Sequence, residues 1–386
     1  MTDTIQLAAP IDLWRDRWDG GSEGYVVLDL GDQPASDFFP KPDAPGPDPR
    51  YPLRMILSAS SGLIQLEDDP TTAEEPIGVE PAALVRQAEL CVSDAEAAGY
   101  LRAGGTVFEY PSPHGGSWEK PLAARGMVEV TEGRADLVAD VHGMMHSADQ
   151  RAAFLERLGH LNDDGVLLMM IHNSASIVRN GMWNALKNGH FAYYSTPALV
   201  RMADDIGLVT IGAWQYALYN NGTTMLAFAR RGSRWGDQPA AVTALVQQEL
   251  DEGITDPARV ASLGRALTEG VASIRGYLDE TRRQGLVVGG YGAASRTASL
   301  LCSADVSSDD MAVIADASVP KHGLSMPVNR IPIVSPADLV AARPDRVLLF
   351  VPDLLPEVRA ALPEIEANGG RWVVLDPMPR EIEPLA

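Results

Sequence analysis

The sequence predicts an α/β protein in which a small β-rich N-terminal module precedes two Rossmann-like units. Three observations support this fold class. A proline-rich stretch with short apolar strands on either side occupies the first 75 residues. From about residue 81, helical and strand patterns alternate, as they do in doubly wound sheets. A glycine-rich turn near residue 290 then follows a strand and begins the alternation again.

The N-terminal module is expected to span residues 1–75. Residues 38–51 (FFPKPDAPGPDPRY) must form a loop, because each proline fixes φ and lacks an N–H group. Residues 25–30 (YVVLDL) and 53–66 (LRMILSASSGLIQL) have the composition of strands. We therefore expect a small sheet with a long loop between its strands.

The second unit, residues 76–237, alternates helices and strands. The predicted helices are 81–101, 149–161 and about 197–206, and the predicted strands are 106–110, 135–141, 165–171, 208–214 and 223–230. This order predicts a parallel sheet with helices on both faces. The last two strands flank the turn sequence YNNG and are expected to form an antiparallel hairpin at the sheet edge.

Residues 238–284 have helical periodicity with a break near 253–257, which predicts a connector of two helices. The C-terminal unit, residues 285–386, begins with the glycine-rich turn. Its other predicted segments are strands at 311–316, 346–351 and 371–376 and a helix at 355–367. With 386 residues in all, three domains are consistent with usual domain sizes.

Composition narrows the function classes. Lys plus Arg number 31 against 52 for Asp plus Glu, a net charge of −21 that disfavours nucleic acid and anionic membranes as partners. Two cysteines exclude a disulfide framework and a cysteine-rich zinc site. The N-terminal residues lack a basic, apolar leader pattern, and no run reaches 18 apolar residues. We expect a soluble, cytoplasmic protein with a small-molecule substrate, free or bound to a carrier.

In its motifs the chain resembles the three-domain sugar C-methyltransferases, which methylate carbon 3 of nucleotide-linked keto-deoxysugars in antibiotic pathways. That family has a zinc module, a central S-adenosylmethionine domain and a C-terminal Rossmann-like domain. The resemblance covers nearly all of residues 25–384. It is carried by LDLGDQPASDFF, YPLRMILSASSGLIQL, HFAYYS, YNNGTTMLAF, VVGGYGAASRTASLL, IADASVPKHGLSMPVNRIPI and RPDRVLLFVPD. It implies a methyltransferase-like Rossmann fold for residues 76–237.

The chain departs from the family at the zinc and cofactor positions. Ser58 and Ser61 replace one cysteine pair and the other pair is absent, so no metal is expected. In the cofactor turn Glu109 and Gly115 remain, but His114 replaces an acid between prolines. About 30 residues that carry the second strand and the ribose-binding acid in the family are missing here, which predicts that no cofactor binds. Binding of S-adenosylmethionine remains the alternative.

The catalytic segments are also altered. The family's Tyr-His-Glu-His aligns with residues 187–190, so His190 alone persists, and His-Gly-Gly-Ser aligns with residues 220–223. We take His190 as a candidate base, and Lys187 and His146 as further catalytic candidates. The substrate-binding candidates are Asn184, Asn188, Tyr193, Asn220, Asn221, Lys321 and Arg330. The alternatives are packing histidines, solvated basic side chains and turn-forming asparagines.

The C-terminal glycine turn is a candidate phosphate site. Gly290, Gly292 and Ser295 precede a predicted helix, and Asp316 ends the next strand. Glycines at this position let backbone N–H groups face a phosphate at the helix N-terminus. The resemblance implies either a sugar-nucleotide site or a purely architectural turn.

Three functions remain open. The first is a tailoring enzyme that keeps the scaffold but not methyl transfer, and closes a ring such as an aziridine by intramolecular displacement of sulfate. The second is a divergent S-adenosylmethionine-dependent C-methyltransferase acting on a nucleotide-linked keto-sugar. The third is a non-catalytic partner protein. The sequence does not predict the oligomeric state.

Overall fold

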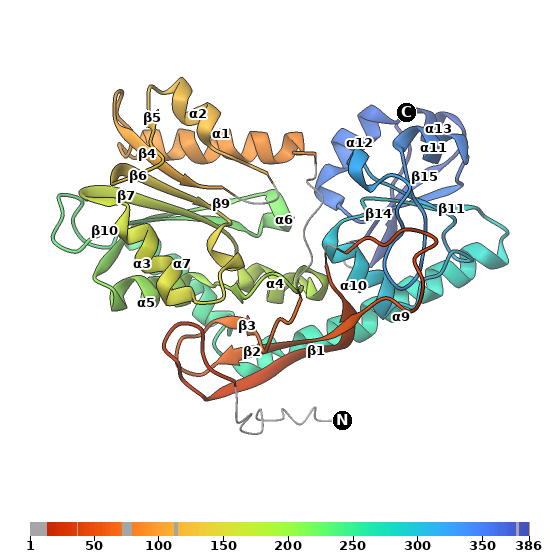
Figure 1. Ribbon diagram of the computed structural model, residues 1–386, viewed down its shortest axis with the longest axis horizontal. Coiled ribbons are helices and arrows are strands. Elements are labelled where there is room, and N and C mark those ends of the chain that lie inside the picture. The colour runs from red at the N-terminus through yellow and green to blue at the C-terminus, as the bar shows by residue number, and fades with distance from the viewer. Residues whose placement is uncertain (1–13, 37, 72–78, 112–114, 376–377, 386) are drawn as a thin grey trace.

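The computed structural model describes residues 14–36, 38–71, 79–111, 115–375 and 378–385. Two α/β lobes stand side by side above a small sheet, with the central domain on the left and the C-terminal domain on the right in Figure 1. Each lobe is built on a six-stranded sheet, and the small sheet has four strands. The predicted α/β class is confirmed.

The small sheet contains one strand from outside the expected N-terminal module. Its order is β1 (Gly24–Pro34), β2 (Arg50–Ser58), β3 (Ile64–Leu66) and β8 (Ala192–Tyr193). The first three confirm the predicted strands. β8 comes from the segment that also holds His190, and it pairs with β3 through Ile64 and Tyr193. The N-terminal module therefore helps to hold a segment of the central domain.

The central sheet is parallel apart from one strand, Thr223–Arg230, which runs antiparallel to both of its neighbours. Its order is β5 (Val128–Glu129), β4 (Thr106–Tyr110), β6 (Ala135–Val141), β7 (Leu161–His172), β10 (Thr223–Arg230) and β9 (Leu208–Tyr216). β9 and β10 pair antiparallel with β9 at the edge, which confirms the predicted hairpin. The helical segments are α1 (Ala82–Ala97), α2 (Glu119–Ala124), η1 (Met144–His146), α3 (Gln150–Gly159), α4 (Ser174–Asn180), η2 (Trp183–Ala185), α5 (Thr196–Asp205) and α6 (Leu218–Asn221).

The connector has three helices, where two were predicted. α7 (Ala240–Asp251) and α9 (Ser262–Arg283) are separated by a short α8 (Pro257–Val260). Asp256 caps α8 through the amide of Ala258, and Pro257 provides a first-turn residue with a fixed φ. In the part of the chain that the structure describes, no helix is both long and apolar enough to cross a membrane.

The C-terminal domain is a second parallel sheet with one antiparallel edge. Its order is β13 (Ile333–Val334), β12 (Ile314–Ala315), β11 (Val288–Tyr291), β14 (Arg346–Leu349), β15 (Arg371–Leu375) and β16 (Pro379–Glu381). Its helical segments are α10 (Ser295–Ser303), η3 (Val319–Lys321), α11 (Pro336–Ala341), η4 (Pro352–Leu354), α12 (Leu355–Ala361) and α13 (Glu364–Ala367). The predicted helix at 355–367 is thus two short helices.

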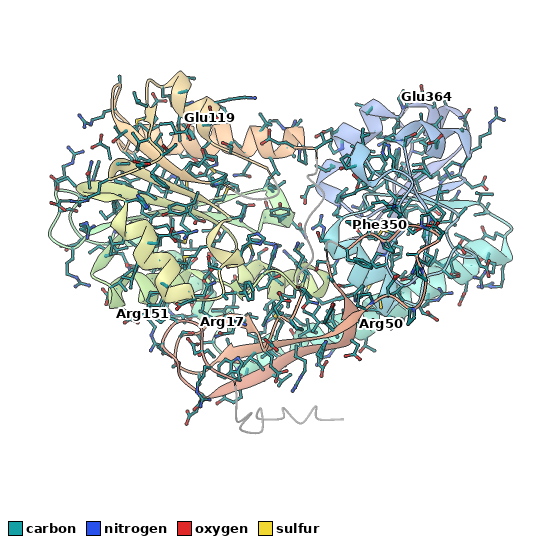
Figure 2. The ribbon with its side chains drawn as sticks, in the orientation of Figure 1. Arg17, Arg50, Glu119, Arg151, Phe350 and Glu364 are labelled. Atoms are coloured by element: carbon teal, nitrogen blue, oxygen red, sulfur yellow. The ribbon has the colours of Figure 1, made fainter. Side chains whose placement is uncertain are left out.

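Two arginines join the N-terminal module to the central domain. Both lie near the lower left of the molecule in Figure 2. The Arg17 guanidinium donates to the carbonyl of Ala148, and the Arg151 guanidinium lies 5.1 Å from the ring of Trp18. Trp18 is also edge-on to Phe154 on α3, so the module and the central domain share one core. This shared core fixes the module against the domain.

A buried aspartate, Asp16, contacts Ser58 and Ser61 in the N-terminal module. One oxygen of Asp16 accepts from the amides of Trp18 and Asp19, and the other accepts from Ser61 Oγ at 2.6 Å and Gln65 Nε2 at 2.9 Å. Among the described residues, no group of His, Cys, Asp and Glu has the arrangement of a metal site. The hydroxyls of Ser58 and Ser61 do not fit zinc, which binds thiolate or imidazole.

We expect Asp16→Asn to lower the free energy of unfolding by about 1–3 kcal/mol at neutral pH, because the new amide N–H group would face donors. Burial raises the pKa of Asp16, but hydrogen bonds from Ser58, Ser61 and two backbone amides outweigh burial and lower it. The unfolded chain then binds more protons, so this stabilisation is present above about pH 4 and is lost as the pH falls further.

Urea denaturation from pH 7 to pH 3 checks this prediction. The difference between wild type and Asp16→Asn should shrink as the pH falls through the pKa of folded Asp16. Asp68→Asn is the matched control, because Asp68 lies in the same module with an exposed side chain. A pH-independent difference would contradict the role given to the Asp16 carboxylate.

Candidate active site

A cavity of about 250 Å³ lies between the central and C-terminal domains. Its polar lining consists of His142, His172, Lys187, His190 and Tyr219 from the central domain, and Ser295, Arg296 and Asp353 from the C-terminal domain. Ligand pockets usually measure roughly 300–1,000 Å³, so this cavity suits a small molecule. Asp353 is the one carboxylate within the described lining, although the whole chain is strongly acidic.

One tyrosine hydroxyl organises the segment that carries Lys187 and His190. The Tyr193 hydroxyl donates to the carbonyl of Ala185 at 2.9 Å, accepts from the Lys187 amide at 3.0 Å and lies 3.2 Å from Nδ1 of His190. Burial raises the pKa of Tyr193 far above that of free tyrosine, so it stays a phenol. Its only proton goes to Ala185, so its contact with His190 favours a proton on Nδ1. Nε2 of His190 is then the nitrogen that can accept a proton.

The second predicted histidine, His146, packs against His190. His146 Nδ1 is 3.0 Å from the carbonyl of Gly189, which requires a proton on that nitrogen because a carbonyl only accepts. The ring of His146 stands edge-on to the ring of His190, with 4.7 Å between centroids. His146 itself is not among the residues that line the cavity. The structure therefore brings the predicted residues His146 and His190 into contact, and Lys187 lies in the same segment as His190.

The structure corrects one alternative interpretation of the sequence, in which Lys187 is a solvated surface residue. A lysine in a loop was expected to be solvated, but Lys187 is only 5% exposed. The turn that Tyr193 fixes encloses it at the wall of the cavity. The solvated-surface interpretation of Lys187 is therefore wrong.

His172 and Tyr219 line the cavity and stack on each other, and neither was predicted as a site residue. The ring of His172, at the end of β7, lies 4.8 Å from the ring of Tyr219 at an interplanar angle of 27°. Tyr219, Asn220 and Asn221 all have positive φ, between 55° and 58°. Asparagine tolerates this left-handed conformation and tyrosine rarely does, so the strain falls on Tyr219. Asn220 and Asn221 adopt the turn geometry proposed as the alternative to substrate binding.

We expect His172 to remain neutral between pH 5 and pH 8. Burial lowers the pKa of His172 to about 3, with His142 and Arg296 as further causes. Since free histidine titrates near 6.5, the unfolded chain binds more protons between these values. This contribution to stability is therefore complete above about pH 6.5 and declines as the pH falls below it.

Imidazole resonances followed by NMR across this pH range test the prediction. The signal of His172 is identified by its loss in the His172→Asn variant. A signal that moves with a midpoint near pH 6.5 would contradict a neutral His172. A signal without a midpoint in this range is the expected result.

The C-terminal glycine turn is packed by apolar side chains. A Cβ atom on Gly290 would lie 2.7 Å from Met311 Sδ, and one on Gly292, where φ is +98°, would lie 2.9 Å from a methyl group of Val351. The same Cβ atom on Gly290 would lie 2.9 Å from the ring of Phe350, which is labelled inside the C-terminal lobe in Figure 2. Both glycines are thus required by packing, which favours the architectural reading of the turn.

The charged residues near this turn serve the fold. Lys321 is buried, donates to the carbonyl of Ala293 at 2.9 Å and lies 3.6 Å from the Asp316 carboxylate. The solvated reading of Lys321 is therefore wrong, and the carboxylate of Asp316 is already engaged. Arg330 pairs with Asp48 and donates to two carbonyls of the proline-rich loop. Neither Lys321 nor Arg330 lines the cavity.

The two remaining asparagine candidates lie beside the site. Asn184 is in η2. Asn188 is 1% exposed, and its carbonyl accepts from Ser36 Oγ at 3.1 Å. Its side-chain amide has no hydrogen-bond partner among the described residues. Neither asparagine is part of the cavity lining, so their role in substrate binding stays a prediction.

The described residues of the cofactor segment are joined by hydrogen bonds among themselves and to Glu80. Glu109 accepts from the Trp118 amide and from Ser117 Oγ, and Gly116 N–H donates to the carboxylate of Glu80. A Cβ atom on Gly115 would lie 3.3 Å from the same Glu80 side chain, Gly115 lines the cavity, and His114 lies outside the described residues.

The second strand of the central sheet was predicted to be missing. It is present as β5, but it has two residues and ends opposite Val107, two positions before Glu109. The strand ends in Glu129, an acid near enough to Glu109 to add to the effect of burial in raising the pKa of the Glu109 carboxyl. An acid is therefore present where the sequence predicted none.

Comparison with known proteins relates the chain to C-methyltransferases. Residues 220–379 match the family of C-methyltransferase C-terminal domains. The chain is 24% identical over 266 residues to the C-methyltransferase NovU of Streptomyces niveus, a match that covers 68% of this chain and 61% of NovU. It thus spans less than two thirds of that relative.

Among solved structures, the chain is similar to magnesium protoporphyrin IX methyltransferase from Synechocystis with bound SAH. The TM-score is 0.29, with 10% identity over 39% of this chain and 84% of that one. A second similar structure is 1,6-didemethyltoxoflavin-N1-methyltransferase of Burkholderia thailandensis, with a TM-score of 0.28 and 14% identity over 46% of this chain and 96% of that one.

Proposed function

We propose that this protein is a natural-product tailoring enzyme on a C-methyltransferase scaffold, and that it closes a ring by intramolecular displacement without methyl transfer. The observation that carries the proposal is the lining of the cavity. Three imidazoles and the buried Lys187 line a small space. Such a site is suited to proton transfer and to stabilising an anion.

The proposed substrate carries an ammonium group and, on a neighbouring carbon, a sulfate ester. Nε2 of His190 removes a proton from the ammonium, and the freed nitrogen lone pair attacks the carbon that bears the sulfate. The new C–N bond forms as the C–O bond breaks, and the electron pair leaves with sulfate toward Lys187. The products are a protonated aziridine, sulfate and a protonated His190, and the aziridine loses its extra proton to water after release. This reaction requires only positioning, a base and electrostatic stabilisation.

The similarity to NovU favours a second candidate, a divergent C-methyltransferase acting on a nucleotide-linked keto-sugar. The match to the C-methyltransferase C-terminal domain also supports it. S-adenosylmethionine would then supply the methyl group, and Glu109 with Gly115 would be the residues left to hold it. Glu129, at the end of the two-residue β5, would be the acid for its ribose hydroxyls.

Turnover with and without S-adenosylmethionine separates the two candidates. The enzyme is incubated with amine-bearing sulfate esters, sulfate is measured by ion chromatography and the organic product by mass spectrometry. We expect equal sulfate release in both conditions and a product without an added methyl group. Release that requires S-adenosylmethionine, or a methylated product, would contradict the first candidate and support the second.

A further inference from the structure

A buried carboxylate on the connector contacts two segments that lead into the cavity. Glu249, in α7, is 0% exposed. Its Oε1 accepts from Asn173 Nδ2 at 2.7 Å and from Thr196 Oγ1 at 2.6 Å, and its Oε2 accepts from the Thr196 N–H at 2.7 Å. All three donors are uncharged, and a carboxylate, which only accepts, satisfies each of them. A buried charge is costly unless its hydrogen bonds are made, so these contacts fix its partners in place.

The first of these segments reaches the cavity through a histidine. Asn173 directly follows His172, which ends β7 and lines the cavity. The Asn173 N–H donates to the carbonyl of Gly222 at 2.7 Å and so holds the turn that begins at Tyr219. Asn173 Oδ1 accepts from the Ala175 N–H at 2.8 Å and caps α4. The position of Asn173 therefore affects both rings that stack at this wall of the cavity.

The second segment carries the proposed base. Thr196 follows Tyr193 in this segment, and the Tyr193 hydroxyl lies 3.2 Å from Nδ1 of His190. The Ser174 N–H donates to the carbonyl of Tyr194 at 2.8 Å, so the two segments also bind each other directly. The carboxylate on α7 thus fixes the point at which both segments meet.

We infer that Glu249 is a positioning residue of the active site. Through Asn173 and Thr196 it holds the two segments in the register that places both imidazoles in the cavity. The inference rests on the proposed function in taking one of these imidazoles, His190, as the base. Glu249 is not among the described residues that line the cavity, so it acts only through its partners. The connector is then part of the catalytic assembly as well as the link to the C-terminal domain.

Glu249→Gln tests the inference, because it keeps the size of the side chain and removes one acceptor. In either orientation the new NH₂ group faces a donor, Asn173 Nδ2 or the Thr196 N–H. We expect kcat for sulfate release to fall about 10-fold to 100-fold, since displacing a catalytic group by about 1 Å has an effect of this size. The NMR signals of the His172 and His190 rings, each identified by its loss in a variant without that histidine, should shift.

A reciprocal exchange tests whether this one hydrogen bond is responsible. In Glu249→Gln with Asn173→Asp, the amide donates to the new carboxylate, so the bond is made in the opposite direction. We expect the double variant to recover most of the lost kcat and the ring signals of wild type. Asn173→Asp alone opposes two buried carboxylates and should be the least active of the three variants.

Asp310→Asn is the matched control for lost stability. Asp310 is also a buried carboxylate, with a side chain 3% exposed, and it pairs with Arg275 and Arg282 of α9. It is not one of the described residues that line the cavity. At a temperature at which every variant is folded, Asp310→Asn should be less stable than wild type but keep its kcat and both ring signals.

Three results would overturn the inference. The first is wild-type kcat and ring signals in Glu249→Gln. The second is an equal loss of kcat in Asp310→Asn, which would make the effect one of general stability. The third is a double variant that is no more active than Glu249→Gln.

Failure of the proposed reaction gives a different result, because the ring signals do not depend on turnover. If wild type releases no sulfate, signals that shift in Glu249→Gln and return in the double variant still support the positioning role. Sulfate release by wild type, with ring signals that do not move in Glu249→Gln, would remove the positioning role and leave the reaction.

Discussion

Replacing His190 by alanine is expected to lower turnover by about 10²–10⁴-fold, the usual contribution of a general base. The reason lies in the contacts of its ring. Nδ1 faces the Tyr193 hydroxyl, whose own proton is donated to Ala185, so the ring is held with Nε2 as the proton acceptor. Without this imidazole the substrate amine stays protonated and has no lone pair for attack. Initial rates of sulfate release across a pH series measure the effect.

The control for this variant is a histidine outside the cavity. His160 is a half-buried residue that follows α3, its ring stacks on Phe108 and its Nδ1 contacts the carbonyl of Gly133. His160→Ala should therefore keep full turnover. Near-wild-type turnover in His190→Ala, with intact circular dichroism, would exclude His190 as the base. His172 would not replace it in this role, because its low pKa makes it a weak proton acceptor at neutral pH.

The strands and long helices of the two lobes could be predicted because their apolar residues repeat with a clear period. Strands β4, β6 and β10 match the predicted residues at both ends. β8 could not be predicted as part of the N-terminal sheet, because two residues carry no period and their partner is distant in sequence. The short β5 was missed for the same reason. A local sequence pattern predicts that a helix or strand forms, but the packing of the folded chain determines which other elements lie beside it.

The site was predicted less completely than the fold. His190 and Lys187 were found through their place in a family motif, and both line the cavity. His142 and His172 directly follow β6 and end β7, where the carboxyl ends of parallel strands usually form sites, so position alone could have indicated them. Arg296 was not predicted, because the glycine pattern before it indicates a turn and the helix that follows has no separate signal for a site.

The sequence predicted the burial of charged side chains less well than any other property. Lys187 and Lys321 were expected at the surface with some preference, since lysine is rarely buried. Both are buried, although Tyr193, which accepts from the Lys187 amide, and Asp316, which lies 3.6 Å from Lys321 Nζ, are close to them in sequence. The distant partner of Lys321 is the carbonyl of Ala293. Burial depends on which elements pack around a side chain in the tertiary fold, so a single sequence gives no local signal for it.

Asp140→Asn is expected to lower the free energy of unfolding by about 3–5 kcal/mol, because it leaves a buried arginine charge without its partner. Asp140 Oδ2 lies 2.6 Å from Arg157 Nε, and both side chains are almost fully buried. Asp140 Oδ1 accepts from the amides of Gly143 and Met144 and so fixes the turn that holds His142 and His146. Chemical denaturation measures the loss, and turnover should fall with it.

Two further variants separate the ion pair from the turn. In Asp140→Leu with Arg157→Leu the buried charge is gone, so stability should recover in part, since replacing a whole buried pair by apolar residues is often tolerated. Turnover should stay low, because the amides of Gly143 and Met144 still lack their acceptor. Asp163→Asn, which removes an exposed pair with Arg134, should change neither property. Full turnover in the double variant would mean that the histidine turn holds its shape without Asp140, and that this carboxylate serves stability alone.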